Sequence, residues 1–239
     1  IYFFFFLQSC FYTIMNFYKW AVLLGFLISA SLLSGCGKVA YTPCDGPNQA
    51  PNTCIAPIKG QTLNLSVGTG RTVVTLFADF QCPGCQAFHK NSEPILLQMA
   101  ESGSITFERK NYPLPMHQNA RKEALWSLCA ASAWKYDAYR DLVYTTESER
   151  TMKGLAKTVM NTSQIALLSE KIGLDGAKME ECIDDKWYEW ELKSQQSQAD
   201  KWKLTATPSL YVDGALIQAN TQDPEELKKV IENYIAQKK

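Results

Sequence analysis

Residues 72–85 read TVVTLFADFQCPGC, and this stretch decides the fold. Its first half is apolar and β-branched, which predicts a buried strand, and Pro83 suits the first position of a helix. At a helix start, unpaired backbone N–H groups and the positive end of the helix dipole stabilise a thiolate. We therefore expect Cys82 to be the acidic, exposed sulfur that attacks and is attacked. Cys85, one turn further on, should be buried and act as the resolving thiol.

The same Cys-x-x-Cys spacing has two other interpretations, a structural disulfide and half of a zinc site. A zinc ribbon needs a second Cys-x-x-Cys at a suitable distance, and the sequence contains none. The strand–turn–helix context favours redox chemistry. In that case the Cys82–Cys85 disulfide is itself the redox centre, and neither a cofactor nor a metal ion is expected.

Composition limits the class of protein and its compartment. The 239 residues include 24 basic and 24 acidic side chains and are 46% hydrophobic, so there is no basic excess that would indicate nucleic-acid binding. Eight cysteines are many for a reducing cytosol and are easily explained in an oxidising compartment. We expect an extracytoplasmic protein, in a periplasm or at a cell surface.

The amino-terminal residues 1–35 are expected to be a signal or upstream segment. Residues 20–33 are apolar but too short to span a bilayer comfortably, and Leu33-Ser34-Gly35 leads into Cys36. This ending resembles a lipoprotein signal, so we expect cleavage before Cys36, lipidation of its thiol, and a lipid-anchored tether over residues 36–60. The alternative is an uncleaved anchor helix, but polar residues would interrupt the apolar run of such a helix.

The next signals predict a β-α-β unit. The expected elements are strands over residues 62–67 and 72–78, a helix over 83–100 and a parallel strand over 105–110. Pro94 should break the helix near Lys90, with Asn91 or Ser92 capping the second part.

The remaining chain changes character twice. Residues 117–203 carry helical signals, and strands over 208–212 and 215–217 then flank a hairpin turn at Asp213-Gly214. Asp223 should cap the last helix, with Glu226 completing a capping box.

Three quoted segments carry a family resemblance: FADFQCPGC at 77–85, YPLPMH at 112–117 and ATPSLYVDG at 206–214. Together they resemble the DsbA-like family of thiol–disulfide oxidoreductases, and within it the BdbD-type proteins. The resemblance implies an α/β protein, a thioredoxin fold with an inserted all-helical domain. It divides the chain into a thioredoxin-like domain (61–116 and 204–239) and a helical insertion (117–203).

The resemblance also supplies a second half of the site. In thioredoxin folds a cis proline faces the cysteine pair, and Thr207-Pro208 stands at that position. A cis bond at Pro208 would expose the backbone of Ala206 and Thr207 for pairing with an extended substrate peptide. The alternative is an ordinary trans proline at the start of an edge strand.

Several residues are expected to tune the redox potential. Thr207 and the central dipeptide Pro83-Gly84 are the first, and Gly84 stands where the strongest oxidases of the family carry His, which implies a less oxidising enzyme. Leu76 occupies the place of the buried acid of thioredoxins. Asp79 is expected either to handle a proton instead or to be a solvated or capping residue.

Two histidines and four cysteines complete the candidates. His89 is expected to be a packed or surface residue or to modulate Cys85, and His117 to have a helix-start or hydrogen-bonding role. Cys44, Cys54, Cys129 and Cys182 allow three pairings. We expect Cys129 with Cys182 and Cys44 with Cys54, the alternative being that Cys129 is only a small apolar residue.

The function implied is a membrane-tethered, monomeric oxidoreductase that introduces disulfides into exported proteins. Its expected partners are reduced or unfolded exported proteins, a quinone-linked membrane reoxidant of the DsbB or VKOR type, and the membrane through the lipid anchor, with no nucleic acid. The alternatives are an extracytoplasmic disulfide reductase or isomerase and a Cu(I)-binding lipoprotein that uses the two thiolates as soft ligands.

Overall fold

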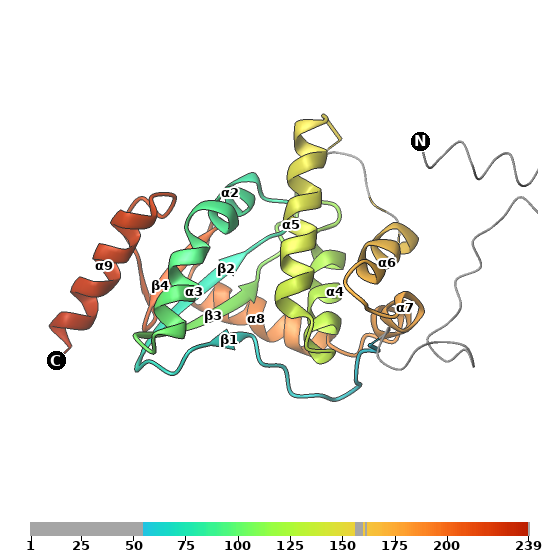
Figure 1. The fold of residues 1–239 in the computed structure, drawn as a ribbon, viewed down its shortest axis with the longest axis horizontal. Helices are drawn as coiled ribbons and strands as arrows, with labels where there is room; N and C mark the ends of the chain where they lie inside the picture. The colour runs from blue at the N-terminus through green and yellow to red at the C-terminus, as the bar shows by residue number, and fades with distance from the viewer. Residues whose placement is uncertain (1–54, 156–159, 161, 239) are drawn as a thin grey trace, which may run out of the picture. The chain divides into compact units, whose positions relative to one another are not determined.

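Strand β2 (Thr72–Ala78) lies at the centre of a five-stranded sheet with the order β1-β3-β2-β4-β5. The computed structural model describes residues 55–155, 160 and 162–238. Strand β2 pairs in parallel with β3 (Ile105–Asn111) and antiparallel with β4 (Ser209–Val212), as Figure 1 shows. Because β2 has neighbours on both sides and is covered on both faces, nearly all of its residues are buried, as its apolar sequence predicts.

The edge strands are shorter than the sequence predicts. Strand β1 contains only Ser66–Val67, although the alternation of residues 62–67 predicts a strand over the whole segment. At the other edge, β5 (Ala215–Leu216) pairs with β4 through a turn in which Asp213 and Gly214 have φ values of 48° and 84°. Two positive φ values suit the predicted two-residue hairpin.

The predicted break in the first helix is present. Helix α2 (Pro83–Asn91) ends where α3 (Glu93–Glu101) begins, with Ser92 between them and Pro94 in the first turn of α3. Ser92 makes no side-chain capping bond, so the break follows from the missing N–H and the ring of the proline.

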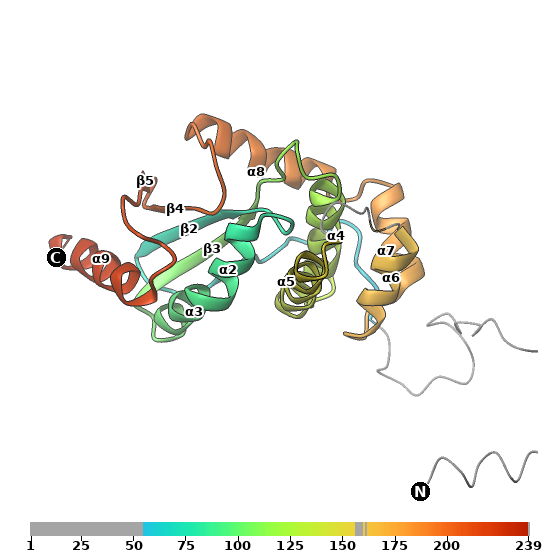
Figure 2. The ribbon, with the colours of Figure 1, turned by 90° about the horizontal axis from the view of Figure 1, so that it is seen from above.

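Helices cover both faces of the sheet. Figure 2 shows α2, α3 and α9 (Pro224–Gln237) on one face and α8 (Glu189–Lys201) on the other. On the α8 face, Phe77 makes edge-to-face contacts with Trp202 and Tyr211, with ring centroids 5.7 and 5.9 Å apart. On the opposite face, Val74 and Leu76 belong to the main hydrophobic core.

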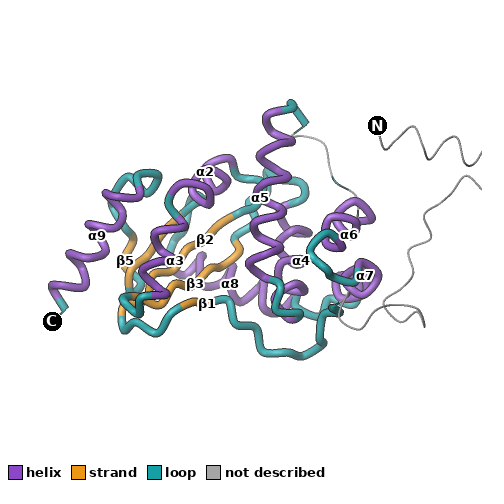
Figure 3. Tube along the Cα trace, in the orientation of Figure 1, coloured by secondary structure: helices purple, strands orange, loops and turns teal. Residues whose placement is uncertain are grey.

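The helical insertion contains α4 (Ala120–Ser132), α5 (Tyr136–Met152), α6 (Thr162–Glu170), α7 (Gly176–Asp184) and α8. Helices α4 to α7 of the insertion lie beside the sheet, whereas α8 covers one of its faces (Figure 3). A disulfide between Cys129 and Cys182 joins α4 to α7. The described residues all belong to one compact unit, so the insertion packs continuously against the sheet domain.

The end of the segment interpreted as a tether is fixed to the insertion. Ile55 forms a β-bridge with Leu174, and the Ile58 N–H donates to Ser132 Oγ at 3.1 Å. The Tyr188 hydroxyl donates to the Ile58 carbonyl. Residues 55–58 therefore lie against the loop between α6 and α7 and the ends of α4 and α8.

The last helix is capped differently from the prediction. Asp223 accepts hydrogen bonds from the N–H groups of Glu225 and Glu226, as expected of an N-cap residue. The Glu226 carboxylate accepts from Asn220 N–H at 3.3 Å and not from Asp223, so the capping box is wrong. The Asp223 N–H is already bonded to the Asn220 carbonyl, which leaves it no need of Glu226.

The predictions for residues 1–54 fall outside the described residues. They are the signal segment, lipidation of Cys36, the Cys44–Cys54 pair and most of the tether. Within the described part of the chain, no helix has the length and apolar character needed to cross a membrane.

Candidate active site

The two cysteines of the motif lie at the start of α2. Cys82 is the N-cap residue, and its carbonyl accepts from the N–H groups of Cys85 and Gln86 at 2.9 and 3.0 Å. Both sulfurs are free thiols. Cys85 is 1% exposed, as expected, but Cys82 is only 8% exposed, which corrects the prediction of an exposed sulfur. The cover comes from another part of the chain, since Cys82 Sγ lies 3.2 Å from the Thr207 carbonyl oxygen.

The two thiols have opposite acidities. The pKa of Cys82 is lowered to about 5, mainly by a hydrogen bond from Cys85. Burial opposes this effect, and hydrogen bonds from Thr207 and backbone groups add to it. Burial raises the pKa of Cys85 well above its usual range, and the Cys82 thiolate beside it adds to the effect. At neutral pH, therefore, Cys82 is a thiolate and Cys85 keeps its proton.

The second half of the site comes from the start of β4. The Thr207–Pro208 peptide bond is cis, at the position that the family resemblance indicates. The Thr207 hydroxyl oxygen is buried and, while both cysteines are thiols, has no hydrogen-bond partner in the described part of the chain. Towards a Cys82 thiolate this hydroxyl donates, and so lowers the pKa of Cys82. Ala206 beside it is exposed, and its carbonyl accepts a hydrogen bond from Ser209 Oγ at 2.7 Å.

Gly84 allows the two halves to approach closely. A β-carbon added at Gly84 would lie 3.2 Å from Pro208 Cδ and 3.7 Å from Cys82 Sγ. A side chain at this position would have to displace Pro208 or point away from it. The Cys82 thiolate is therefore stabilised by Cys85, Thr207 and backbone N–H groups, and not by a side chain between the two cysteines.

Asp79 is buried and fully engaged. The side chain accepts from the N–H groups of Gln81 (2.8 Å) and Leu114 (2.7 Å), and its Oδ2 lies 2.8 Å from His117 Nδ1. The backbone N–H of Asp79 donates to Cys85 Sγ at 3.4 Å. With a residue exposure of 2%, Asp79 is not the solvated residue of one alternative. It joins the active-site loop 79–82 to the segment that leads into α4, with His117 in a hydrogen-bonding role.

A charged network that the sequence analysis missed holds α2 and α3 against α5. Arg140 donates to both carboxylate oxygens of Glu93 at 2.7 and 2.8 Å, and both side chains are buried. Burial alone would raise the pKa of Glu93, but the Arg140 charge and His89 lower it to about 2. His89 bridges Glu93 (2.7 Å) and Asp141 (3.1 Å). No sequence signal pairs these residues, because Glu93 and Arg140 are 47 positions apart.

Two glutamines near the cysteines were also missed. Gln222, in the loop before α9, donates to the Gly84 carbonyl at 3.1 Å. Gln81 accepts from the Asn119 N–H at 2.8 Å. Both connect the active-site turn to segments far away in the sequence.

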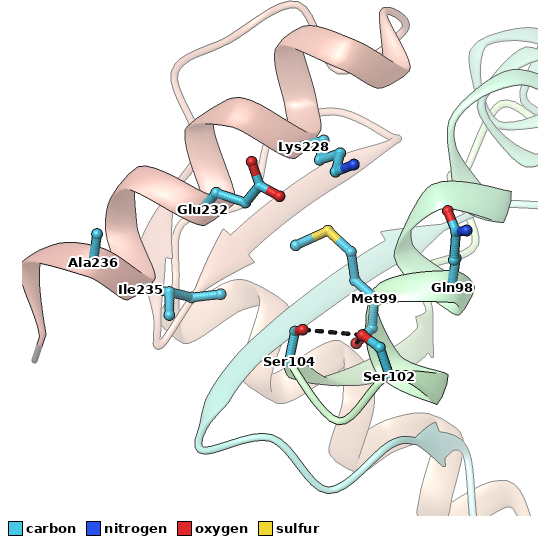
Figure 4. A pocket seen from close by; sticks show the side chains of 8 residues that line it. All are labelled: Gln98, Met99, Ser102, Ser104, Lys228, Glu232, Ile235 and Ala236. Atoms are coloured by element: carbon cyan, nitrogen blue, oxygen red, sulfur yellow. Dashed lines mark hydrogen bonds between the residues drawn. The ribbon is translucent and has the colours of Figure 1, made fainter.

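One cavity in the described part of the chain lies away from the cysteines. It has a volume of about 620 Å³ and lies between α3 and α9, as Figure 4 shows. Its lining residues are Gln98, Met99, Ser102, Ser104, Lys228, Glu232, Ile235 and Ala236. Neither the cysteines nor Thr207 and Pro208 contribute to it. Among residues 55–155, 160 and 162–238, no group of three His, Cys, Asp or Glu side chains is arranged to hold a metal ion.

The fold and the site together define a thiol–disulfide oxidoreductase with a DsbA-like thioredoxin fold. A family model described as thioredoxin matches residues 69–233, well over half of the sequence. The chain belongs to the thioredoxin family.

Relatives and solved structures agree with this class. A probable disulfide bond formation protein D of Bacillus cereus is 23% identical over 89% of this chain and 95% of its own length. The disulfide bond formation protein D of Bacillus subtilis is 22% identical over 74% of this chain and 78% of its own. Among solved structures, oxidised BdbD of Bacillus subtilis has a TM-score of 0.59 and 21% identity, covering 76% of this chain and 99% of that one. Wolbachia pipientis α-DsbA1 has a TM-score of 0.59 and 19% identity, covering 72% and 91%.

Proposed function

We propose that the protein introduces disulfide bonds into exported proteins by exchange through Cys82 and Cys85. The observation that carries the proposal is the asymmetry of the pair, with Cys82 acidic at the helix start and Cys85 buried with its proton. A low pKa makes Cys82 a good leaving sulfur and stabilises the reduced enzyme, and both favour the transfer of a disulfide to a substrate.

The reaction has two exchange steps. A substrate thiolate attacks Cys82 Sγ of the oxidised pair, forming a mixed disulfide while Cys85 leaves as a thiolate and takes up a proton. A second substrate thiolate then attacks the substrate sulfur of the mixed disulfide, and Cys82 leaves as the thiolate. The substrate loses two electrons, which the enzyme dithiol holds.

The segment that precedes β4 is our candidate for the place where a substrate peptide binds. Ala206 is exposed and Thr207 half-buried just before β4, and the Thr207 carbonyl lies 3.2 Å from Cys82 Sγ, so an extended peptide that pairs with this segment would bring its sulfur to Cys82. We assign Thr207 and Pro208 to substrate binding and thiolate stabilisation, with Pro83, Gly84 and Asp79 tuning the potential.

The oxidising strength should be intermediate. A pKa of about 5 for Cys82 lies between about 7 for thioredoxin and about 3.5 for DsbA. This agrees with a Cys-Pro-Gly-Cys motif without a charged residue between the cysteines.

Oxidative refolding tests the direction of the reaction. The oxidised protein should oxidise a reduced, unfolded substrate faster than it reduces insulin when supplied with dithiol. Efficient insulin reduction without substrate oxidation would instead favour the reductase alternative.

The cellular setting is part of the proposal. We infer that the protein acts outside the cytoplasm, anchored through a lipid on Cys36 and reoxidised by a quinone-linked membrane protein of the DsbB or VKOR type. The names of relatives as disulfide bond formation proteins support the disulfide chemistry of this proposal, and the lipid anchor is proposed from residues 33–36 of the sequence. Mass spectrometry of the mature amino terminus is the test, and an unmodified Cys36 would exclude the lipid anchor.

A further inference from the structure

A group of buried polar side chains lies between the active-site loop 79–82 and helices α4 and α5, apart from the sulfur pair. Gln81 links the loop to Asn119, the N-cap residue of α4, and Asp79 links it to His117 just before that helix. Four further members of the group are 0 to 1% exposed: Asn119, Glu123, Tyr139 and Glu147. Within the described residues, no hydrogen bond joins the side chains of these four to a sulfur, so the exchange mechanism leaves their presence unexplained.

Glu123 is the least compensated charge of this group. It is 0% exposed, and neither of its carboxylate oxygens has a hydrogen-bond partner in the described protein. The positive charge that acts on it belongs to Arg150, whose Nε lies 3.0 Å from Glu147 and so already compensates that residue. An ionised carboxylate without a hydrogen bond or its own cation is too costly to bury, so the folded protein favours the neutral acid.

The surroundings agree with a neutral Glu123. The Tyr139 hydroxyl and the Asn119 side-chain amide are also buried without a partner in the described residues, and a protonated carboxyl can both donate and accept. Burial raises the pKa of Glu123 well above 4.5, with further increases from Glu147 and Asp79 and a smaller decrease from Arg150. The titratable groups around Glu123 come from the active-site loop, the segment before α4, and α5: Asp79, His117, Tyr139, Glu147 and Arg150.

We propose that Glu123 is a positioning residue of the exchange site, a neutral, proton-carrying carboxyl group that supports the loop 79–82 from behind. The loop matters because its backbone faces both cysteines. The Asp79 N–H donates to Cys85 Sγ at 3.4 Å, and the Cys82 N–H donates to the Asp79 carbonyl at 3.2 Å. Ionisation of Glu123 would place a further negative charge beside Asp79 and push the loop away from α4. The positioning role of Glu123 rests on the proposed function, whereas the inference that its buried carboxyl group is protonated does not.

The first test measures the buried proton through stability. Because the folded protein holds the proton more tightly than the unfolded chain, stability is full below about pH 4.5 and is lost as the pH rises towards the pKa of the folded state. The unfolding free energies of wild type and Glu123→Gln, measured by urea denaturation, should therefore diverge as the pH rises. The unfolding equilibrium should shift in favour of folded Glu123→Gln by about tenfold for each pH unit above that point.

A matched control is available on α5. Glu149→Gln changes an exposed glutamate two residues from Glu147. The difference in unfolding free energy between this variant and wild type should stay nearly constant with pH. If Glu123→Gln is instead less stable than wild type at neutral pH and the gap closes on acidification, Glu123 is an ionised partner and the proposal is wrong. Infrared spectra give an independent check, because wild type at neutral pH should show a protonated carboxyl band that Glu123→Gln lacks.

The positioning role has its own measurement. Glu123→Gln, which keeps shape and neutrality, should exchange disulfides within about twofold of the wild-type rate, whereas Glu123→Ala should be several-fold slower. Equal rates for Glu123→Ala and wild type would remove the positioning role. A wild-type protein with no exchange activity would contradict the proposed function, while the stability and infrared tests would still report on the proton.

Discussion

The described residues contain two pairs of cysteines, and the pairs differ in sequence spacing, position in the fold and oxidation state. Cys82 and Cys85 are separated by one helical turn, lie at a helix start and are free thiols. Cys129 and Cys182 are 53 residues apart, are both 1% exposed and form a disulfide between two helices. The first pair lies where its surroundings lower the pKa of Cys82 to about 5, whereas the second pair is enclosed between two helices as a disulfide.

Replacing Cys82 tests the reactive pair most severely. Cys82→Ser should reduce disulfide exchange to the uncatalysed background, because a hydroxyl neither accepts nor transfers a sulfur. Oxidation of a reduced model substrate measures the loss. Cys85→Ser, as the companion variant, should still react at Cys82 and accumulate a mixed disulfide. Substantial exchange by Cys82→Ser would mean that the reactive sulfur has been misassigned.

Removing the structural pair should change stability and spare the chemistry. Because the two cysteines are separated by 53 positions, the loss of this disulfide should cost about 4 kcal/mol of unfolding free energy, from the greater freedom of the unfolded chain. Urea denaturation of the double variant Cys129→Val/Cys182→Val measures this. Its exchange rate, at a temperature where it remains folded, should match wild type. A loss of activity in the folded variant would show that the two pairs are coupled.

The pH dependence should separate the reactive pair from the structural one. Ultraviolet absorbance of the reduced protein should show one thiolate appearing with a midpoint near pH 5, from Cys82. Since folding depresses this pKa from 9.0, the Cys82 thiolate stabilises the folded state above pH 9, and this stabilisation is lost as the pH falls to about 5. The change is about tenfold in the unfolding equilibrium for each pH unit, relative to Cys82→Ser. A thiolate midpoint near 9 would contradict the site geometry.

The smallest expected effect concerns Thr207. Thr207→Val keeps the shape but removes the hydroxyl that donates to the Cys82 thiolate, so the pKa of Cys82 should rise by about 0.5 to 1 unit. The same absorbance titration measures the shift. Thr205→Val, an exposed threonine two residues earlier, is the control and should leave the titration unchanged. An unchanged pKa in Thr207→Val would assign the stabilisation to Cys85 and the backbone alone.

Local signals predicted the centre of the fold well. The bounds of β2, the start of α2 at Pro83, the break at Ser92 and the Asp223 cap all depend on residues adjacent in the sequence. The errors have an equally physical cause. Residues 62–67 have strand periodicity, but only Ser66 and Val67 pair with β3, and an edge segment without a partner forms no ladder. Glu226 has the spacing of a capping box, but its carboxylate accepts a hydrogen bond from the N–H of Asn220 instead of that of Asp223.

The site divides in the same way. The motif by itself predicted which sulfurs are the candidates for exchange, because a Cys-Pro-Gly-Cys turn between a buried strand and a helix start brings its own dipole and N–H groups. Only the tertiary structure decided how far Cys82 is covered and that Glu93 meets Arg140. It also decided that, within the described residues, neither carboxylate oxygen of Glu123 has a hydrogen-bond partner. Those contacts join segments tens of residues apart. Their energies depend on burial and on the exclusion of water, and neither exists until the helical insertion has packed against the sheet.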